Sequence, residues 1–128
     1  MPLKDKLVFV VDDDPFITGL VAGRLTTEGY RMRIFAYGEE CLAALHENPD
    51  LIILDYYFIS DTNKPMNGMV VFDEILRIMP GVKVIMLSAQ EKGEVVLELA
   101  RKGISDYVIK DNNLIDNLIV SVKEIFEK

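Results

Sequence analysis

The sequence predicts an α/β domain in which a doubly wound parallel sheet is covered by helices on both faces. Five apolar runs of strand length recur along the chain, at 7–11, 30–36, 51–54, 82–87 and 106–110. Segments of helical periodicity separate these runs, and parallel neighbours require long crossovers of that kind. The 128 residues, half of them hydrophobic, are enough for one domain with its own core. We therefore expect a single domain over residues 1–128.

The predicted strands differ in how apolar they are, and this difference predicts their order in the sheet. The runs at 7–11, 51–54 and 82–87 are almost wholly apolar, as is typical of strands buried on both faces. The runs at 30–36 and 106–110 contain charged residues, so we place them at the edges. The flavodoxin-like order 2-1-3-4-5 satisfies both conditions and gives three αβα layers. It also places a topological switch point between the first and third strands, where ligands bind beyond the carboxyl ends.

Five helices are expected around this sheet, at 15–28, 39–47, 69–79, 91–102 and 114–125. The sequence predicts the start of the first helix clearly, because Asp14 suits the N-cap and Pro15 suits the first helical position. Gly29 is a suitable stop. The apolar residues of this first helix are expected on one face: Phe16, Ile17, Leu20, Val21 and Leu25. Gly19 and Gly23, four residues apart in the same helix, lower helix stability, which suggests that they allow close packing.

Charge and composition exclude several classes of protein. The net charge of −7 and the pI of about 4.7 argue against a phosphate-backbone surface, so no direct nucleic-acid partner is expected. Cys41 is the single cysteine and cannot form an internal disulfide, which fits a reducing, cytoplasmic location. The N-terminal apolar run ends at Asp12 after only five residues. It is too short for a signal peptide or a membrane span.

Polar residues gather at the carboxyl ends of the predicted strands. The first strand runs into acids at 12–14, the third into Asp55, the fourth into Ser88 and the fifth into Lys110. These side chains should meet at one rim of the sheet. Converging carboxylates repel one another and favour a cation, and oxygen ligands without histidine or cysteine favour Mg²⁺. Lys110 and Ser88 suit the binding of anionic oxygens. We assign Asp14 to helix capping and not to the metal.

The strand-end motifs VVDDDP, LIILD, LSA and DYVIK together resemble the response-regulator receiver domain of two-component signalling. The resemblance runs from about residue 6 to the C-terminus. It implies that Asp55 is the phosphoacceptor, and that Mg²⁺ is held by Asp12, Asp13, Asp55 and the backbone carbonyl of Tyr57. It also implies that Ser88 and Lys110 contact the phosphoryl group.

The same resemblance implies the partners and the switch. The phosphoryl donor would be a phosphohistidine on a sensor histidine kinase or a phosphotransfer protein. Ser88 and Tyr107 would form the switch, and the face of the fourth helix, fifth strand and fifth helix would bind an unknown downstream protein. Phosphorylation-dependent dimerisation is left open. His46, the only histidine, is expected at the surface, away from the rim.

Two departures from the family pattern affect the expected site. Position 59 is isoleucine where receivers usually have proline, and the loop over 59–68 is longer than theirs. Lys110 is followed by Asp111 where receivers usually have a cis proline, so the reach of Lys110 and the cis or trans state of that bond stay open. The resemblance to receivers also implies that Tyr57 and Gln90 tune the lifetime of the phosphoryl group. We expect slow self-dephosphorylation, because a bulky Tyr57 would crowd the attacking water.

The leading hypothesis is a stand-alone phosphorylation switch with no output domain, which is no enzyme beyond self-phosphorylation and slow self-dephosphorylation. A receiver cut from a longer regulator or hybrid kinase would have the same sequence. A Mg²⁺-dependent phosphohydrolase is the chief alternative, but it would need a second aspartate where this chain has Tyr57. A degenerate receiver that works without phosphorylation is disfavoured because every phosphorylation position is filled. A flavodoxin-type nucleotide- or flavin-binding protein is disfavoured because the first strand leads into acids and not into a phosphate loop.

Overall fold

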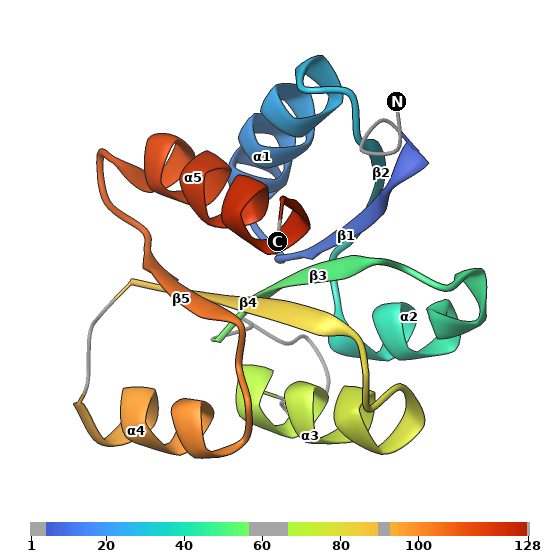
Figure 1. Ribbon diagram of the computed structural model, residues 1–128, viewed down its shortest axis with the longest axis vertical. Helices are drawn as coiled ribbons and strands as arrows, with labels where there is room; N and C mark the ends of the chain where they lie inside the picture. Colours follow the sequence, from blue (N-terminus) through green and yellow to red (C-terminus); the bar gives the residue numbers. More distant parts are fainter. Residues whose placement is uncertain (1–4, 57–66, 90–92, 128) are drawn as a thin grey trace.

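The computed structural model describes residues 5–56, 67–89 and 93–127 and contains one five-stranded parallel sheet in the order β2-β1-β3-β4-β5 (Figure 1). The strands are β1 Leu7–Val11, β2 Arg31–Phe35, β3 Leu51–Asp55, β4 Lys83–Ser88 and β5 Asp106–Ile109. The α-helices are α1 Pro15–Thr27, α2 Gly38–Ala43, α3 Gly68–Ile78, α4 Gly93–Arg101 and α5 Leu114–Phe126. The predicted fold class and strand order are therefore confirmed.

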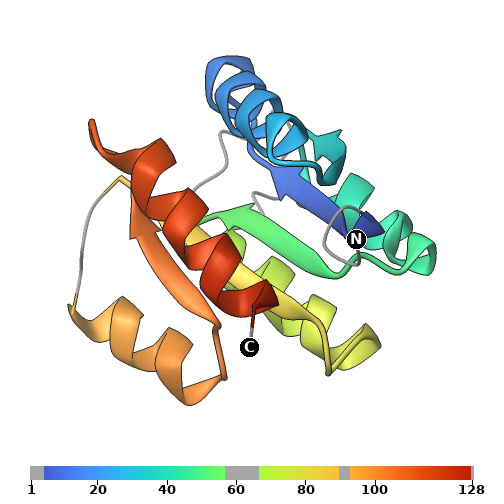
Figure 2. The same ribbon diagram turned by 45° about the horizontal axis from the view of Figure 1, so that its top comes forward.

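Helices α1 and α5 cover one face of the sheet, while α2, α3 and α4 cover the other (Figures 1 and 2). Successive residues of β1 point to opposite faces, as the strand period of two requires. Val8 and Val10 pack with α1 and α5, whereas Phe9 and Val11 pack with the helices of the other face. Every residue of β1 and β3 is buried, while β2 and β5 are partly exposed edges.

The apolar face predicted for α1 is wrong in part. Thr18, Val21 and Leu25 are buried, but Phe16 is 68% exposed and Leu20 is 42% exposed. At 100° per residue, the five apolar residues spread over too wide an arc for one contact. The sheet and α5 cover only the stripe that contains Val21 and Leu25, with Ile17 partly buried beside it, so the side chains of Phe16 and Leu20 remain at the surface.

The ends of α1 follow the sequence signals. The Asp14 side chain accepts a hydrogen bond from the Phe16 N–H at 2.9 Å, and Pro15 is the first helical residue. Gly29 has a positive φ of 101°, and its N–H donates to the Thr26 carbonyl at 3.0 Å. The next N–H, from Tyr30, donates to the Leu25 carbonyl at 3.1 Å. This is the Schellman arrangement, so Gly29 does end the helix.

The interior glycines of α1 do not support the prediction of close packing. A Cβ atom added to Gly19 or Gly23 would meet nothing within 4 Å, and both glycines are exposed. Spacing alone could not show which face of the helix carries them. They lie on the solvent side, where no neighbour approaches.

The helix predicted over 39–47 is shorter than expected. It begins at Gly38, ends at Ala43, and is followed by the short 3₁₀ turn η2, Leu45–Glu47. Asn48 then takes a left-handed φ of 60° before Pro49, which disfavours helical backbone in the residue before it. His46 is exposed, as predicted, but it lies on η2. Within the described residues, no helix combines the length and the apolar character needed to cross a bilayer.

Candidate functional site

The parallel register brings the polar strand ends together. Val11 of β1 pairs with Leu54 of β3, so the next residues, Asp12 and Asp55, lie at the same level of the rim. On the other side of β3, Asp55 pairs with Leu87, which precedes Ser88. The last pair of β4 and β5 is followed by Lys110, whose N–H donates to the Ser88 carbonyl at 2.8 Å. Four of the five strands therefore each place at least one polar residue at the same rim of the sheet.

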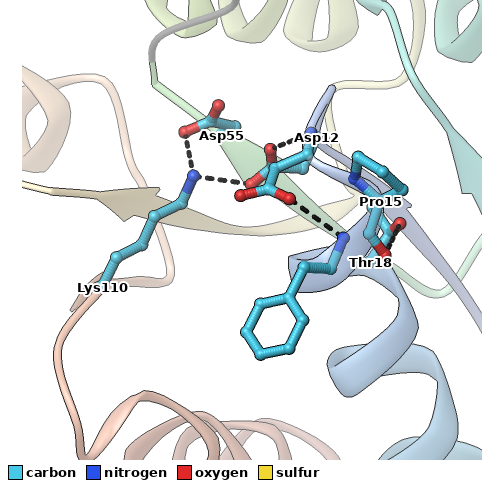
Figure 3. A network of polar contacts seen from close by, with 7 residues as sticks. Asp12, Pro15, Thr18, Asp55 and Lys110 are labelled. Atoms are coloured by element: carbon cyan, nitrogen blue, oxygen red, sulfur yellow. Dashed lines mark hydrogen bonds and ion pairs between the residues drawn. The ribbon is translucent and has the colours of Figure 1, made fainter.

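Lys110 lies between two of the carboxylates (Figure 3). Its Nζ is 2.6 Å from Asp12 Oδ2 and 2.9 Å from Asp55 Oδ1. The described residues contain no cis peptide bond, so the bond from Lys110 to Asp111 is trans. A trans bond thus leaves the lysine within reach of both acids.

The site is buried, and burial affects its titration. Asp12 is 2% exposed and Asp55 is 3% exposed. Burial raises the pKa of Asp12, and Lys110 together with the backbone N–H of Asp14 offsets this only in part. Burial alone would lower the pKa of Lys110, but its contacts with Asp12 and Asp55 outweigh it and raise that pKa. Lys110 is therefore charged throughout the neutral range.

Three carboxylates at this rim form a group that fits a metal ion. Asp12, Asp13 and Asp55 each offer one oxygen, and these oxygens lie within 4.8 Å of one another. Asp12 Oδ2 is buried, and its partner is the Lys110 ammonium at 2.6 Å. One ammonium cannot balance three carboxylates, and an all-oxygen set favours a hard divalent cation. Asp14 stays outside the group, because its carboxylate caps α1.

Of the other predicted site residues, two lie within the described part of the chain and two lie outside it. Ser88 is 2% exposed at the end of β4, and Tyr107 is half-buried on β5. Tyr57 and Gln90 lie outside the described residues, as does most of the loop over 59–68. Sequence reasoning missed the contact of Gly68 with the backbone next to Asp55, where the Gly68 N–H donates to the Tyr56 carbonyl at 2.6 Å. An Asn-Gly pair just before a helix was the available signal.

Comparison with known proteins identifies the family. Residues 8–123 match the response regulator receiver domain. The chain belongs to this family. The chemotaxis protein CheY of Thermotoga maritima is 31% identical to this receiver domain over 107 residues, which cover 82% of this chain and 85% of CheY.

Other relatives of this receiver domain are longer. The nitrogen assimilation regulatory protein NtrX of Azorhizobium caulinodans is 33% identical over 121 residues, covering 94% of this chain and 26% of NtrX. The transcriptional regulatory protein GlrR of Escherichia coli is 33% identical over 111 residues, covering 86% of this chain and 24% of GlrR. The chain thus spans about a quarter of the length of these two relatives.

Solved structures agree with this assignment. The response regulator TrrA of Thermotoga maritima, solved in complex with Mg²⁺-BeF, superposes with a TM-score of 0.78 and is 32% identical in sequence. The match covers 94% of this chain and 98% of the TrrA chain. NtrX of Brucella abortus has a TM-score of 0.84 and 30% sequence identity, and the match covers 96% of this chain and 28% of the NtrX chain. Both resemble the receiver domain along nearly all of its length.

Proposed function

We propose that this receiver domain accepts a phosphoryl group on Asp55, with Mg²⁺ as cofactor. The observation that carries the proposal is the placement of the buried Asp55 carboxylate. It lies 2.9 Å from the Lys110 Nζ and belongs to a group of three carboxylates whose oxygens lie within 4.8 Å. The complex of the related TrrA with Mg²⁺-BeF supports Mg²⁺ as the ion. The donor is a phosphohistidine of a sensor histidine kinase or of a phosphotransfer protein.

The reaction follows from the residues at the rim. An Asp55 carboxylate oxygen forms a bond to phosphorus as the phosphorus–nitrogen bond of phosphohistidine breaks, and the imidazole leaves with the electron pair. Phosphoryl transfer has a loose transition state, so positioning and charge stabilisation supply most of the catalysis. Bound Mg²⁺ would supply positive charge close to the phosphoryl oxygens. Asp12, Asp13 and Asp55 would hold it, together with the backbone carbonyl of Tyr57, which lies outside the described residues.

Lys110 and Ser88 contact the phosphoryl oxygens in this proposal. Lys110 exchanges its ion pair with Asp55 for one with the new phosphoryl group. Ser88 follows Leu87, the register partner of Asp55, and its hydroxyl moves toward the phosphoryl group. Tyr107, half-buried on the neighbouring strand β5, then turns inward. These movements change the face formed by α4, β5 and α5, to which a downstream protein binds.

The domain acts as a phosphoacceptor and not as an enzyme of many turnovers. Self-dephosphorylation is slow, and Tyr57 and Gln90 set its rate. As a part of two-component signalling, the domain works in the cytoplasm. The kinase or phosphotransfer protein and the downstream protein are its two classes of partner.

The proposal is tested by phosphorylating the 128-residue chain with acetyl phosphate and Mg²⁺ and measuring its intact mass. One phosphoryl adduct is expected, and it should be absent from Asp55→Asn and from samples treated with a chelator. Asp73→Asn is the matched control, because Asp73 pairs with Lys102 at 2.8 Å, outside the carboxylate group of the rim. That variant should keep the adduct. An adduct on Asp55→Asn contradicts the proposal, and steady phosphate release over many turnovers would show a hydrolase.

A further inference from the structure

The backbone next to the phosphoacceptor is held from two sides. The Tyr56 N–H donates to the Leu87 carbonyl of β4 at 2.8 Å. The Tyr56 carbonyl accepts a hydrogen bond from the N–H of Gly68, the first residue of α3, at 2.6 Å. The residue that follows Asp55 is therefore fixed both to the neighbouring strand and to the start of a helix that lies beyond the loop.

Gly68 can make this contact because it has no side chain. A Cβ atom at this position would lie 2.5 Å from the Asp55 carbonyl oxygen and 2.6 Å from Tyr56 Cα. It would also lie 3.0 Å from Met86 Sδ. The two shortest contacts are with main-chain atoms, which cannot turn away as a flexible side chain can. A side chain at this position would therefore displace the Asp55 backbone or the start of α3.

This crowding is not general among the glycines of the chain. A Cβ atom at Gly19, Gly23 or Gly81 would meet nothing within 4 Å. Asn67, the N-cap of α3, accepts a hydrogen bond from the Val70 N–H at 3.0 Å through its side chain. Asn67 thus starts the helix, while Gly68 brings it against the phosphoacceptor strand.

We propose that Gly68 is a positioning residue for phosphoryl transfer, which fixes the Asp55 carboxylate relative to Asp12 and Lys110 through the backbone of Tyr56. This inference rests on the proposed function of Asp55. Its physical basis is that the carboxylate oxygens must lie close to one another to share a cation, and that one Asp55 oxygen must meet the phosphorus in line. A shift of the Asp55 backbone would move its carboxylate away from both the shared cation and the phosphorus.

The test compares Gly68→Ala with Asn67→Ala. Asn67→Ala removes the helix cap but adds no atom near Asp55, so it controls for lost stability. The rate constant of phosphorylation by acetyl phosphate is measured by intact mass, and the Kd for Mg²⁺ by calorimetry. We expect Gly68→Ala to be phosphorylated roughly 10- to 100-fold more slowly and to bind Mg²⁺ more weakly. Asn67→Ala should keep both values while unfolding at a lower urea concentration.

The outcomes separate the two proposals. Unchanged phosphorylation and Mg²⁺ affinity in folded Gly68→Ala would overturn the positioning role, as would equal losses in both variants. If the wild-type chain takes no phosphoryl group, the proposed function fails, and the Mg²⁺ affinities still decide the role of Gly68. If Gly68→Ala does not fold, amide hydrogen exchange of the wild-type chain decides it. The Gly68 amide should then be protected and should exchange more slowly with Mg²⁺ bound, and fast exchange would contradict the contact.

Discussion

At the scale of single residues, Lys110 is an internal counterion for the carboxylates of the rim. It lies 2.6 Å from Asp12 Oδ2 and 2.9 Å from Asp55 Oδ1, and only 18% of its side chain is exposed. The same two acids raise the pKa of Lys110 despite its burial, so the ammonium persists. A metal ion that binds these acids must therefore compete with a cation that the protein itself supplies.

Replacing Lys110 should separate metal binding from phosphorylation. Lys110→Ala removes the competing ammonium, so the Kd for Mg²⁺ should fall by about tenfold, which corresponds to ~1.4 kcal/mol. Phosphorylation by acetyl phosphate should slow by roughly 10²-fold, because the cation that we propose contacts the phosphoryl oxygens is lost. Calorimetry and intact-mass kinetics measure the two effects. Lys102→Ala, which breaks the pair with Asp73 away from the rim, should change neither. Weaker Mg²⁺ binding by Lys110→Ala would refute the competition.

At the scale of elements, α1 shows how local signals set the ends of a helix and leave its buried face open. Asp14 caps the start and Gly29 ends the last turn with a positive φ of 101°. Both effects act through hydrogen bonds to nearby residues, so the sequence carries them. Which apolar side chains are buried depends on contacts with β1, β2 and α5. Phe16 and Leu20 therefore match the helical pattern and are nevertheless exposed.

Alanine at Gly23, inside α1, and at Gly29, just past its end, should have effects of opposite sign. Gly23 is an exposed interior position with open space around a new Cβ atom. Gly23→Ala should therefore raise the free energy of unfolding by about 0.5–1 kcal/mol. Gly29→Ala should lower it by roughly 1 kcal/mol or more, because an L side chain is strained at that φ. Urea denaturation measures both changes. Destabilisation by Gly23→Ala would show that the position is packed after all.

At the scale of the whole molecule, the sheet separates two hydrophobic cores. One lies under α1 and α5, and the other lies under α2, α3 and α4 and contains the fully buried Cys41. Burial raises the pKa of the Cys41 thiol to about 12. Between pH 9 and 12 the unfolded chain binds fewer protons at this thiol than the folded one, so this group lowers the stability as the pH rises through that window.

Cys41 should consequently report the unfolding of the α2, α3 and α4 side of the molecule. At pH 8 only about 10⁻⁴ of a thiol with a pKa near 12 is ionised, and thiolate is the reactive form. Native protein should resist iodoacetamide, while protein in urea should be alkylated rapidly at one site. Mass spectrometry over a urea series measures the modified fraction. Rapid alkylation of the native chain would show that this core opens readily.

The sequence by itself determined the class of fold, the strand order and the membership of the acidic group. These follow from local properties, namely the apolar periods, the charged edge strands and the acids placed at strand ends. Asp12, Asp13 and Asp55 could be grouped because parallel strands of one sheet end at the same rim. Asp14 could be set apart because capping is a local hydrogen bond.

Only the tertiary structure decided which residues meet across the chain. The trans bond after Lys110 and the place of its Nζ between Asp12 and Asp55 depend on how β5 lies in the sheet. The open space at Gly23 and the crowding at Gly68 depend on which neighbours approach each glycine. The two glycines cannot be told apart from the sequence, because the spacing of residues reflects the period of the backbone and not which neighbouring atoms pack against each position.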